Sequence, residues 1–341
     1  MRGLVCVPIA LALAVSLGAC TRSVEPVTRS REVLGTTVSV TVYGDDASTA
    51  VPIVSAFAAM TFVEKRLSPY DASSAIAAFN RTPFERHALP PDAMAIIDRT
   101  KELGVSDSFS PALFGVTALY DFGGAGTVPA PVAIHDAAQI ARTFVVRDGT
   151  AWFERPPVIS GEARSIAATP GLDFGGASKG LALDRSRQAL SGSPALITAG
   201  SSTLAFGHKP DGQPWRVGIE DPREVGRVLA VVSSEGTLSV STSGDYQTYF
   251  DRDGIRYHHI LDPATGLPAR GLRSLTVFGA MSALDADILS TALFVMGPDR
   301  ALAYARAHAL GVYLVDDHGV ARSSVPASFA VTLSTEAQPT P

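Results

Sequence analysis

The segment from Leu172 to Asp184 constrains this chain most, because it places an acidic residue, two adjacent glycines and a lysine in a short loop that opens onto a helix. Its sequence is LDFGGASKGLALD. Leu172 and Phe174 are typical of a strand end, and the apolar positions after Gly180 recur at helical spacing. Lys179 then lies at the helix N-terminus, where the helix dipole favours an anion. The segment indicates a phosphate or metal site, with an ordinary glycine turn as the alternative.

A second segment, Tyr257 to Pro268, has the sequence YHHILDPATGLP. Asp-Pro and Gly-Leu-Pro end a strand abruptly, which places His259 and Asp262 at a strand end or in a tight turn. Side chains at such positions meet ligands on a rigid support. A hairpin with surface histidines is the alternative interpretation.

The third segment, from Leu284 to Gly297, is a run that is apolar on nearly every side after Asp287, as in a buried helix. Asp287, Ser290 and Thr291 are three or four residues apart and share one helix face. A carboxylate that enters a buried helix needs a partner, and a hard cation bound by oxygen ligands is one candidate. Capping of the helix N-terminus by Asp287 is the other.

These three segments, in this order, resemble three motifs of the ApbE family, the FAD:protein FMN transferases. The matches, each followed by the family pattern, are Asp173 to Gly180 (D-L-G-G-I-A-K-G), His259 to Pro263 (H-I-I-D-P) and Ala286 to Leu293 (A-D-A-L-A-T-A-L). Weaker similarities lie at Leu34-Gly35-Thr36 (M-G-T), Leu67-Ser68-Pro69-Tyr70 with Asn80 (L-S-x-Y and S-E-L-x-x-L-N) and Phe109-Ser110-Pro111 (F-D-P). The resemblance spans about residues 31–325.

The resemblance implies an α+β fold, with helices packed around mixed sheets in one compact domain over residues 31–333 and the active site in a cleft. It implies Mg2+-dependent transfer of FMN from FAD, the substrate, to a Thr or Ser hydroxyl of an acceptor protein, with release of AMP. The implied acceptors are flavinylated subunits of membrane redox complexes. Two other functions would use the same site: hydrolysis of FAD to FMN and AMP, and FAD binding without chemistry.

The resemblance also implies a role for each site residue. His259 is the implied general base or phosphate contact. The implied flavin-nucleotide contacts are Leu34, Tyr70, Phe109, Ser110, Pro111, Asp173, Lys179, His259 and Leu261. The implied metal ligands are Asp287, Ser290, Thr291 and the backbone carbonyl of Gly176. The sequence departs from the family pattern at Leu34, Ser110 and His258, where Met, Asp and Ser are usual, and the first two departures affect the flavin contacts.

The composition fits a globular enzyme. Of 341 residues, 46% are hydrophobic and 18% charged, which suffices for a large core. The net charge is -5 and no run of Lys and Arg occurs, which argues against nucleic acid as a partner. Helices and strands mix without strict alternation, which favours α+β. The pattern predicts a strand over residues 33–43, helices over 54–66, 92–103, 111–120 and 301–310, a helix and short strands over 132–157, and strands over 196–243 and 311–315.

The N-terminus carries a targeting signal. Arg2 precedes an apolar run from Leu4 to Leu17, which is shorter than the roughly 20 residues of a membrane-spanning helix. Leu-Gly-Ala then precedes Cys20, as in a bacterial lipoprotein signal. We therefore expect a signal peptide over residues 1–19, a lipidated Cys20, a tether over 20–30 and a mobile tail over 334–341. This arrangement predicts a lipid-anchored protein of the bacterial cell envelope that faces the periplasm, with a short uncleaved anchor as the alternative.

Overall fold

The computed structural model describes residues 25–155 and 169–333, and its centre is an eight-stranded antiparallel sheet. The predicted signal peptide, Cys20 and the predicted C-terminal tail lie outside the described residues. In spatial order the strands are β1 (Pro26–Val33), β2 (Thr36–Tyr43), β6 (Ala195–Ala199), β7 (Ser202–Phe206), β10 (Leu238–Gly244), β13 (Leu272–Gly279), β14 (Gly311–Asp316) and β15 (Ala321–Ser324).

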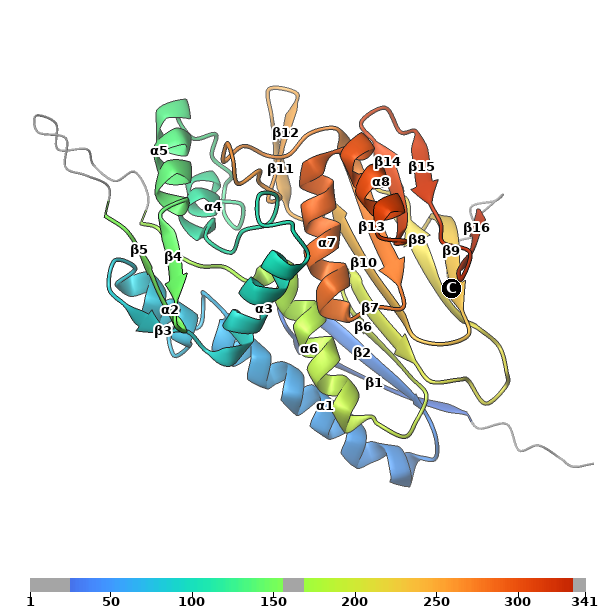
Figure 1. The fold of residues 1–341 in the computed structure, drawn as a ribbon. Helices are drawn as coiled ribbons and strands as arrows, with labels where there is room; N and C mark the ends of the chain where they lie inside the picture. Colours follow the sequence, from blue (N-terminus) through green and yellow to red (C-terminus); the bar gives the residue numbers. More distant parts are fainter. Residues whose placement is uncertain (1–24, 156–168, 334–341) are drawn as a thin grey trace, which may run out of the picture.

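Helices cover one face of this sheet, with α6 and α7 over its middle strands (Figure 1). The covering helices are α1 (Asp46–Leu67), α6 (Gly175–Ala189), α7 (Ala283–Met296) and α8 (Pro298–Ala307), and α3 (Pro91–Glu102) packs against α1, α6 and α7. The main hydrophobic core lies between these helices and the sheet. α7 is buried on nearly all sides, as its apolar sequence predicts.

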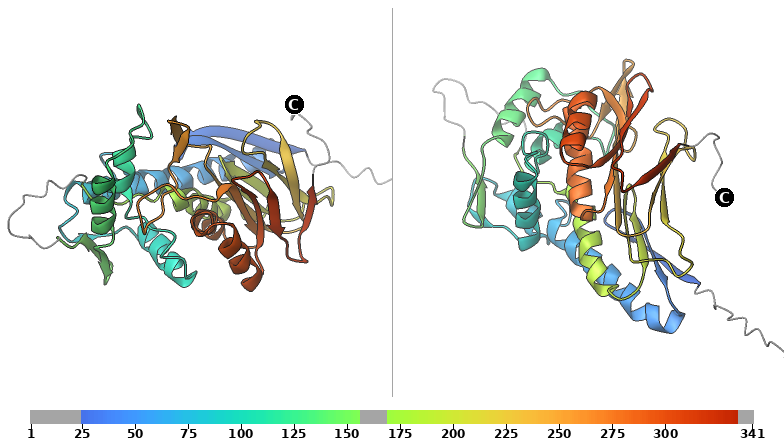
Figure 2. Two further views of the ribbon diagram at one scale, coloured as in Figure 1. Left: turned by 90° about the horizontal axis from the view of Figure 1, so that it is seen from above. Right: turned by 45° about the vertical axis from the view of Figure 1, so that its right-hand side comes forward.

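A smaller sheet covers part of the opposite face, so the molecule has three layers there (Figure 2). It consists of β16 (Ala330–Leu333), β9 (Val228–Ser234) and β8 (Trp215–Glu220). Side chains of β10 alternate between the two layers. Leu238 and Val240 belong to the core under the small sheet, while Ser241 and Ser243 face α7.

The remaining elements gather on the other side of α6 and α7 in Figure 1. They are α2 (Ala75–Arg81), α4 (Phe114–Tyr120), α5 (Pro131–Ala141), a three-stranded sheet of β3 (His87–Ala88), β5 (Thr150–Phe153) and β4 (Phe144–Arg147), and the hairpin of β11 (Tyr249–Arg252) and β12 (Ile255–His258). α4 and α5 share a small core with Leu261. The described residues thus confirm the predicted α+β class.

Several predicted boundaries are wrong. The strand expected over residues 33–43 begins only at Thr36, as β2, because Leu34 and Gly35 adopt positive φ angles of 60° and 68° and reverse the chain between β1 and β2. β1 begins at Pro26, so residues 26–30 of the expected tether belong to the sheet. The helix expected over 54–66 begins at Asp46, where the Asp45 side chain accepts a hydrogen bond from Ser48 N.

Two further boundaries differ in the part of the chain that carries the glycine loop. The helix expected over 111–120 begins at Phe114. Leu172 and Phe174 were expected at a strand end, but the chain there makes only an isolated bridge between Gly171 and Leu113. The Asn80 side chain supports it instead, because it accepts from Leu172 N at 2.7 Å and donates to Leu172 O at 3.0 Å.

Candidate active site

The three segments singled out in the sequence meet at one cavity of about 1130 Å³. Asp173 and Lys179 come from the glycine loop and α6, His259 follows β12, and Asp287 with Thr291 lies on α7. The local patterns alone left each segment with a structural alternative. Their convergence on one cavity favours the functional interpretation of all three.

The seam between α6 and α7 fixes one wall of this cavity. A β-carbon at Gly180 would lie 2.2 Å from Ala283 O, so only glycine permits the two backbones to approach this closely. Asp184, one turn further along α6, accepts hydrogen bonds from Ala283 N and Leu284 N, both at 2.9 Å. The Asp184 carboxylate therefore satisfies free N–H groups at the start of α7 and locks the two helices together.

Asp287 lies in this seam with only 2% of its surface exposed. Its Oδ2 accepts from Gly180 N at 2.6 Å, and its Oδ1 accepts from the Ser202 hydroxyl at 2.7 Å. The residue is the fifth of α7, and Ser282 caps that helix by accepting from Asp285 N at 3.0 Å. The capping interpretation of Asp287 is therefore wrong.

A cluster of hydroxyl groups surrounds the next turn of α7. Ser290 Oγ lies 3.1 Å from both Ser241 Oγ and Ser243 Oγ, and it donates to Asp287 O at 3.0 Å. Ser243 Oγ is also 3.2 Å from Thr291 Oγ1. Neither Ser241 nor Ser243 was predicted as a site residue, although their alternation along β10 was a signal for a common face.

The donor set at this wall fits a hard divalent cation. Asp287, Ser290 and Thr291 supply oxygen atoms, and a β-carbon at Gly176 would lie 3.6 Å from Thr291 Oγ1, which places that backbone beside them. Nowhere in residues 25–155 and 169–333 do three or more His, Cys, Asp or Glu side chains form a metal-binding group. A cation here would have one carboxylate among neutral oxygens, the kind of site that Mg2+ shares with substrate phosphates.

His259 lies on another part of the cavity wall. Its backbone N donates to Thr248 O at 3.1 Å, and its Nδ1 is 3.2 Å from the same carbonyl oxygen. A carbonyl can only accept, so Nδ1 carries the proton and Nε2 keeps a free lone pair. Burial lowers the pKa of His259 to about 4 from its ordinary 6.5, so the imidazole is neutral at pH 7 and able to accept a proton.

The adjacent His258 points the other way, as expected for neighbours at a strand end. It is 2% exposed, its Nε2 lies 2.9 Å from Ala269 O, and its ring packs edge-on against Phe294 at a centroid distance of 5.6 Å. Burial lowers the pKa of His258 as well. His258 is therefore a core residue, and only His259 faces the cavity.

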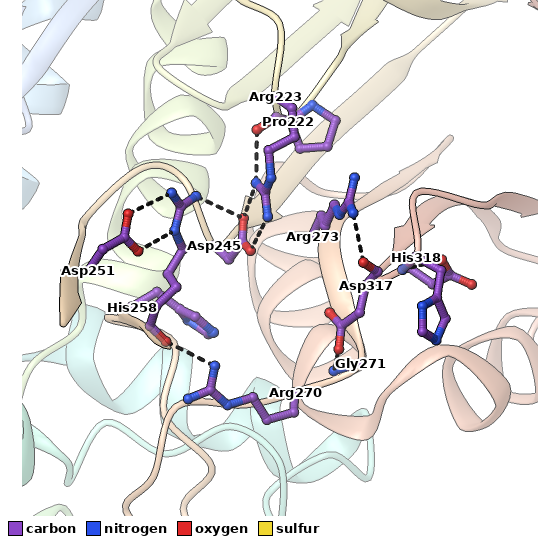
Figure 3. A network of polar contacts seen from close by, with 12 residues as sticks. Pro222, Arg223, Asp245, Asp251, His258, Arg270, Gly271, Arg273, Asp317 and His318 are labelled. Atoms are coloured by element: carbon purple, nitrogen blue, oxygen red, sulfur yellow. Dashed lines mark hydrogen bonds and ion pairs between the residues drawn. The ribbon is translucent and has the colours of Figure 1, made fainter. Parts of the chain in front are cut away.

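An ion-pair network supports the loop of residues 245–248, whose last carbonyl contacts His259 (Figure 3). Arg223 donates to both carboxylate oxygens of Asp245, at 2.7 and 2.6 Å. Arg256 bridges from Asp251, with hydrogen bonds of 3.0 and 3.1 Å, towards Asp245 at 4.0 Å. Asp245 begins the loop that ends at Thr248, so the network fixes the carbonyl that orients His259.

Lys179 and Asp173 lie at the glycine loop. Lys179 is the fifth residue of α6, and its Nζ is 3.5 Å from Gly175 O. Asp173 Oδ1 accepts from Gly175 N at 2.8 Å. Burial raises the pKa of Asp173, while the Gly175 N–H and the Lys179 ammonium lower it. Tyr70, whose pKa is raised by burial and then by Asp173, lines the same region.

The other predicted nucleotide contacts divide between two cavities. Leu34, Phe109, Ser110 and Leu261 line the main cavity. Pro111 does not; it lines a neighbouring cavity of about 800 Å³, and its carbonyl accepts from Asp173 N at 2.7 Å. Pro111 therefore supports the glycine loop from behind, and its contact with the flavin nucleotide stays a prediction.

Comparison with known proteins gives matches over most of the chain. The model of the ApbE family matches residues 34–314. The FAD:protein FMN transferase of Treponema pallidum is 32% identical over 82% of this chain and 81% of its own length. The protein of the same name from Haemophilus influenzae is 28% identical over 95% of this chain and 97% of its own length.

Solved structures agree with this relationship. The ApbE protein of Thermotoga maritima superposes with a TM-score of 0.77 and 27% identity, covering 88% of this chain and 97% of that one. The apo form of the flavinyl transferase ApbE from Pseudomonas stutzeri gives a TM-score of 0.72 and 29% identity, covering 91% and 95%.

Proposed function

Because the match over residues 34–314 shows that this chain belongs to the ApbE family, we propose that it transfers FMN from FAD to a Thr or Ser hydroxyl of an acceptor protein and releases AMP. The curated relatives carry the name of that activity. One observation of the structure supports it most: a neutral His259 and the Asp287 hydroxyl cluster line the same cavity.

His259 is suited to act as the general base. Its Nε2 accepts the proton of the acceptor hydroxyl while the hydroxyl oxygen forms a bond to the FMN-side phosphorus. The bond between that phosphorus and the bridging oxygen breaks, and AMP leaves with the bridging oxygen. The Thr248 carbonyl keeps the imidazole in the tautomer that this step requires.

The part of the cavity wall around Asp287 is suited to the phosphates. Asp287, Thr291 and the Gly176 carbonyl would hold Mg2+, with Ser290 beside them, and the bound cation would neutralise charge on the pyrophosphate. Lys179 supplies a cationic donor for a phosphate oxygen. Asp173 and Tyr70 are placed to contact the ribityl or flavin part of FAD.

The test uses purified protein, FAD, Mg2+ and an acceptor protein whose intact mass is measured before and after. We expect the acceptor to gain the mass of FMN with one AMP released per transfer, and no gain when EDTA replaces Mg2+. Free FMN and AMP with an unchanged acceptor would identify a pyrophosphatase instead. Unchanged FAD would identify a protein that binds the dinucleotide without chemistry.

We also propose that the mature protein begins at an acylated Cys20 and faces the periplasm, where its acceptors would be subunits of membrane redox complexes. The Leu-Gly-Ala-Cys sequence after an apolar run supports this. We expect the protein to enter the detergent phase and the membrane fraction, and Cys20→Ala to release it from both. An unchanged membrane fraction for Cys20→Ala would contradict acylation at this residue.

A further inference from the structure

The long helix α1 carries an apolar stripe on its outer side. The stripe consists of Ala47, Val51, Val54, Ala58 and Phe62, which follow one another at helical spacing. All five are exposed, and the large side chains have exposed fractions of 72% for Val51, 52% for Val54 and 56% for Phe62. We call these five residues the outer stripe.

α1 is apolar on both sides. Its inner side, with Ile53, Phe57 and Met60, is buried in the main core. No charged residue occurs between Asp46 and Glu64. Within the described residues it is the one helix long and apolar enough to cross a membrane, yet only 33% of its most apolar window is buried. Because the inner side anchors α1 in the core, its exposed side is the part that is free to meet an apolar surface.

The start of α1 lies close to the point where the chain enters the fold. Pro26, the first residue of β1, pairs with Tyr43, and Arg29 binds Asp46 in the first turn of α1 at 2.6 Å. α1 runs along the lower edge of the molecule in Figure 1. The six residue-to-residue steps from Cys20 to Pro26 reach at most about 20 Å when extended. An acyl group on Cys20 therefore holds Pro26 within that distance of the bilayer, and the first turn of α1 follows closely after Tyr43, the partner of Pro26.

We propose that the outer stripe of α1 lies on the lipid bilayer that carries the anchor. This inference rests on the acylation of Cys20 proposed above and adds a second contact to it. Membrane attachment by acyl chains is strengthened by a second signal, and an apolar helix face at the interface is one such signal. Lys65 is exposed beyond the outer stripe and can extend its ammonium to lipid phosphates. The Arg66 guanidinium covers the Phe62 ring at 4.9 Å but also pairs with Asp92 at 3.4 Å, so the positive charge offered to lipid comes mainly from Lys65.

The sequence itself allows a clean test. The two cysteines of the sequence are Cys6, in the proposed signal peptide, and Cys20, the proposed acylation site. The acylated mature chain would therefore have no free thiol. Phe62→Cys can then be labelled at one site with an environment-sensitive dye. Val320→Cys is the matched control, because Val320 is 54% exposed on the turn between β14 and β15. Both acylated proteins are placed on phosphatidylethanolamine and phosphatidylglycerol vesicles with or without a nitroxide-labelled lipid.

We expect the nitroxide lipid to quench the dye at position 62 severalfold more than the dye at 320, and its emission to shift to shorter wavelength. Val54→Asp in the Phe62→Cys protein should remove most of this difference. The fold should stay intact, because Val54 is 52% exposed. Equal quenching at 62 and 320 on protein-loaded vesicles would overturn the proposal. A dye response at 62 to protein concentration or acceptor in the absence of vesicles would also overturn it, in favour of a protein interface.

Three separate outcomes distinguish the role of the outer stripe from the acylation of Cys20 and from the transfer activity. A protein that fails to stay on vesicles refutes the acyl anchor. Flavin transfer to a soluble acceptor, measured with Cys20→Ala in detergent-free buffer, tests the enzyme activity on its own. Vesicle retention with intact transfer but equal quenching at the two positions refutes only the role of the outer stripe.

Discussion

The two walls of the cavity are built in different ways. The Asp287 wall lies in a helix seam, where Gly180 admits a backbone contact and Asp184 caps the neighbouring helix. The His259 wall follows a two-stranded hairpin and depends on one loop carbonyl and the ion pair of Arg223 with Asp245. The Asp287 wall is therefore part of the core, whereas the His259 wall depends on a loop and a hairpin outside the core. Changes in the seam are expected to affect folding and activity together, and changes at His259 to affect rate alone.

The strongest test of this contrast is Asp287→Asn. Loss of the only carboxylate in the proposed metal site is expected to lower flavin transfer at least about a thousandfold, which corresponds to about 4 kcal/mol of transition-state stabilisation. Mg2+ titration of FAD turnover measures it. Asp285→Asn is the control, since Asp285 lies on the same helix as Asp287, pairs with Arg99 of α3 and does not line the cavity. Similar losses in both variants would contradict a special role for Asp287.

The second test addresses the His259 wall. His259→Gln is expected to lower the transfer rate about a hundredfold, or about 2.7 kcal/mol, with little change in FAD affinity or unfolding midpoint. His258→Gln is expected to lower the unfolding midpoint and to leave the transfer rate nearly unchanged, because that ring is buried against Phe294. Paired measurements of rate, FAD affinity and denaturant midpoint decide between the two. A rate loss at His258 that exceeds the loss at His259 would reverse the assignment.

The third test strains the seam without touching a polar group. Gly180→Ala places a methyl group against Ala283 O and is expected to reduce the free energy of unfolding by about 2 kcal/mol. Metal-dependent turnover should fall with it, because the Asp287 carboxylate moves with the helix. Gly236→Ala, where a β-carbon meets open space, is the control and is expected to change stability by about 0.5 kcal/mol or less. A stable Gly180→Ala protein would show that the seam can open freely.

The smallest expected effect is the response of the transfer rate to mild acid. Burial lowers the pKa of His259 to about 4, so the base stays neutral and active well below the ordinary histidine range. The rate is expected to change less than about twofold between pH 7.5 and 5.5 and to fall as the pH drops through about 4. Single-turnover rates across this range measure it. A midpoint near pH 6.5 would mean that His259 is solvated like a surface histidine.

The sequence predicts those parts of the site that depend on local periodicity. Helical spacing places Asp287 beside Thr291, and strand alternation separates His259 from His258. It does not predict the partners of these residues. The Ser202 hydroxyl and the Thr248 carbonyl reach Asp287 and His259 only through sheet register and a loop, which no local pattern contains. The serines of β10 alternate visibly, yet only the packing of α7 on that face buries them.

The boundaries that failed have equally physical causes. Leu34 was expected in a strand because β-favouring residues alternate over residues 33–43, but it adopts a positive φ, rare for leucine, in the hairpin turn. The predicted helix began at residue 54, just after Pro52, a residue that disfavours a helix interior. The first two turns of α1 form nevertheless, because the Asp45 cap and the buried side of the helix stabilise them. A strand end was predicted before the glycine loop because Leu172 and Phe174 are apolar; both are buried, although no continuous strand pairs with them.

The hydrogen bonds of Asp287 also set when the catalytic centre comes into existence during folding. Its carboxylate is joined to residues 107 and 85 positions earlier in the chain. Contacts of such high sequence separation form late, after the loops between them have closed. Gly180 and Ser202 precede Asp287 in the chain, so neither contact can form before α7 is present. The candidate site therefore lacks its Asp287 carboxylate until α7 has packed against α6 and β7.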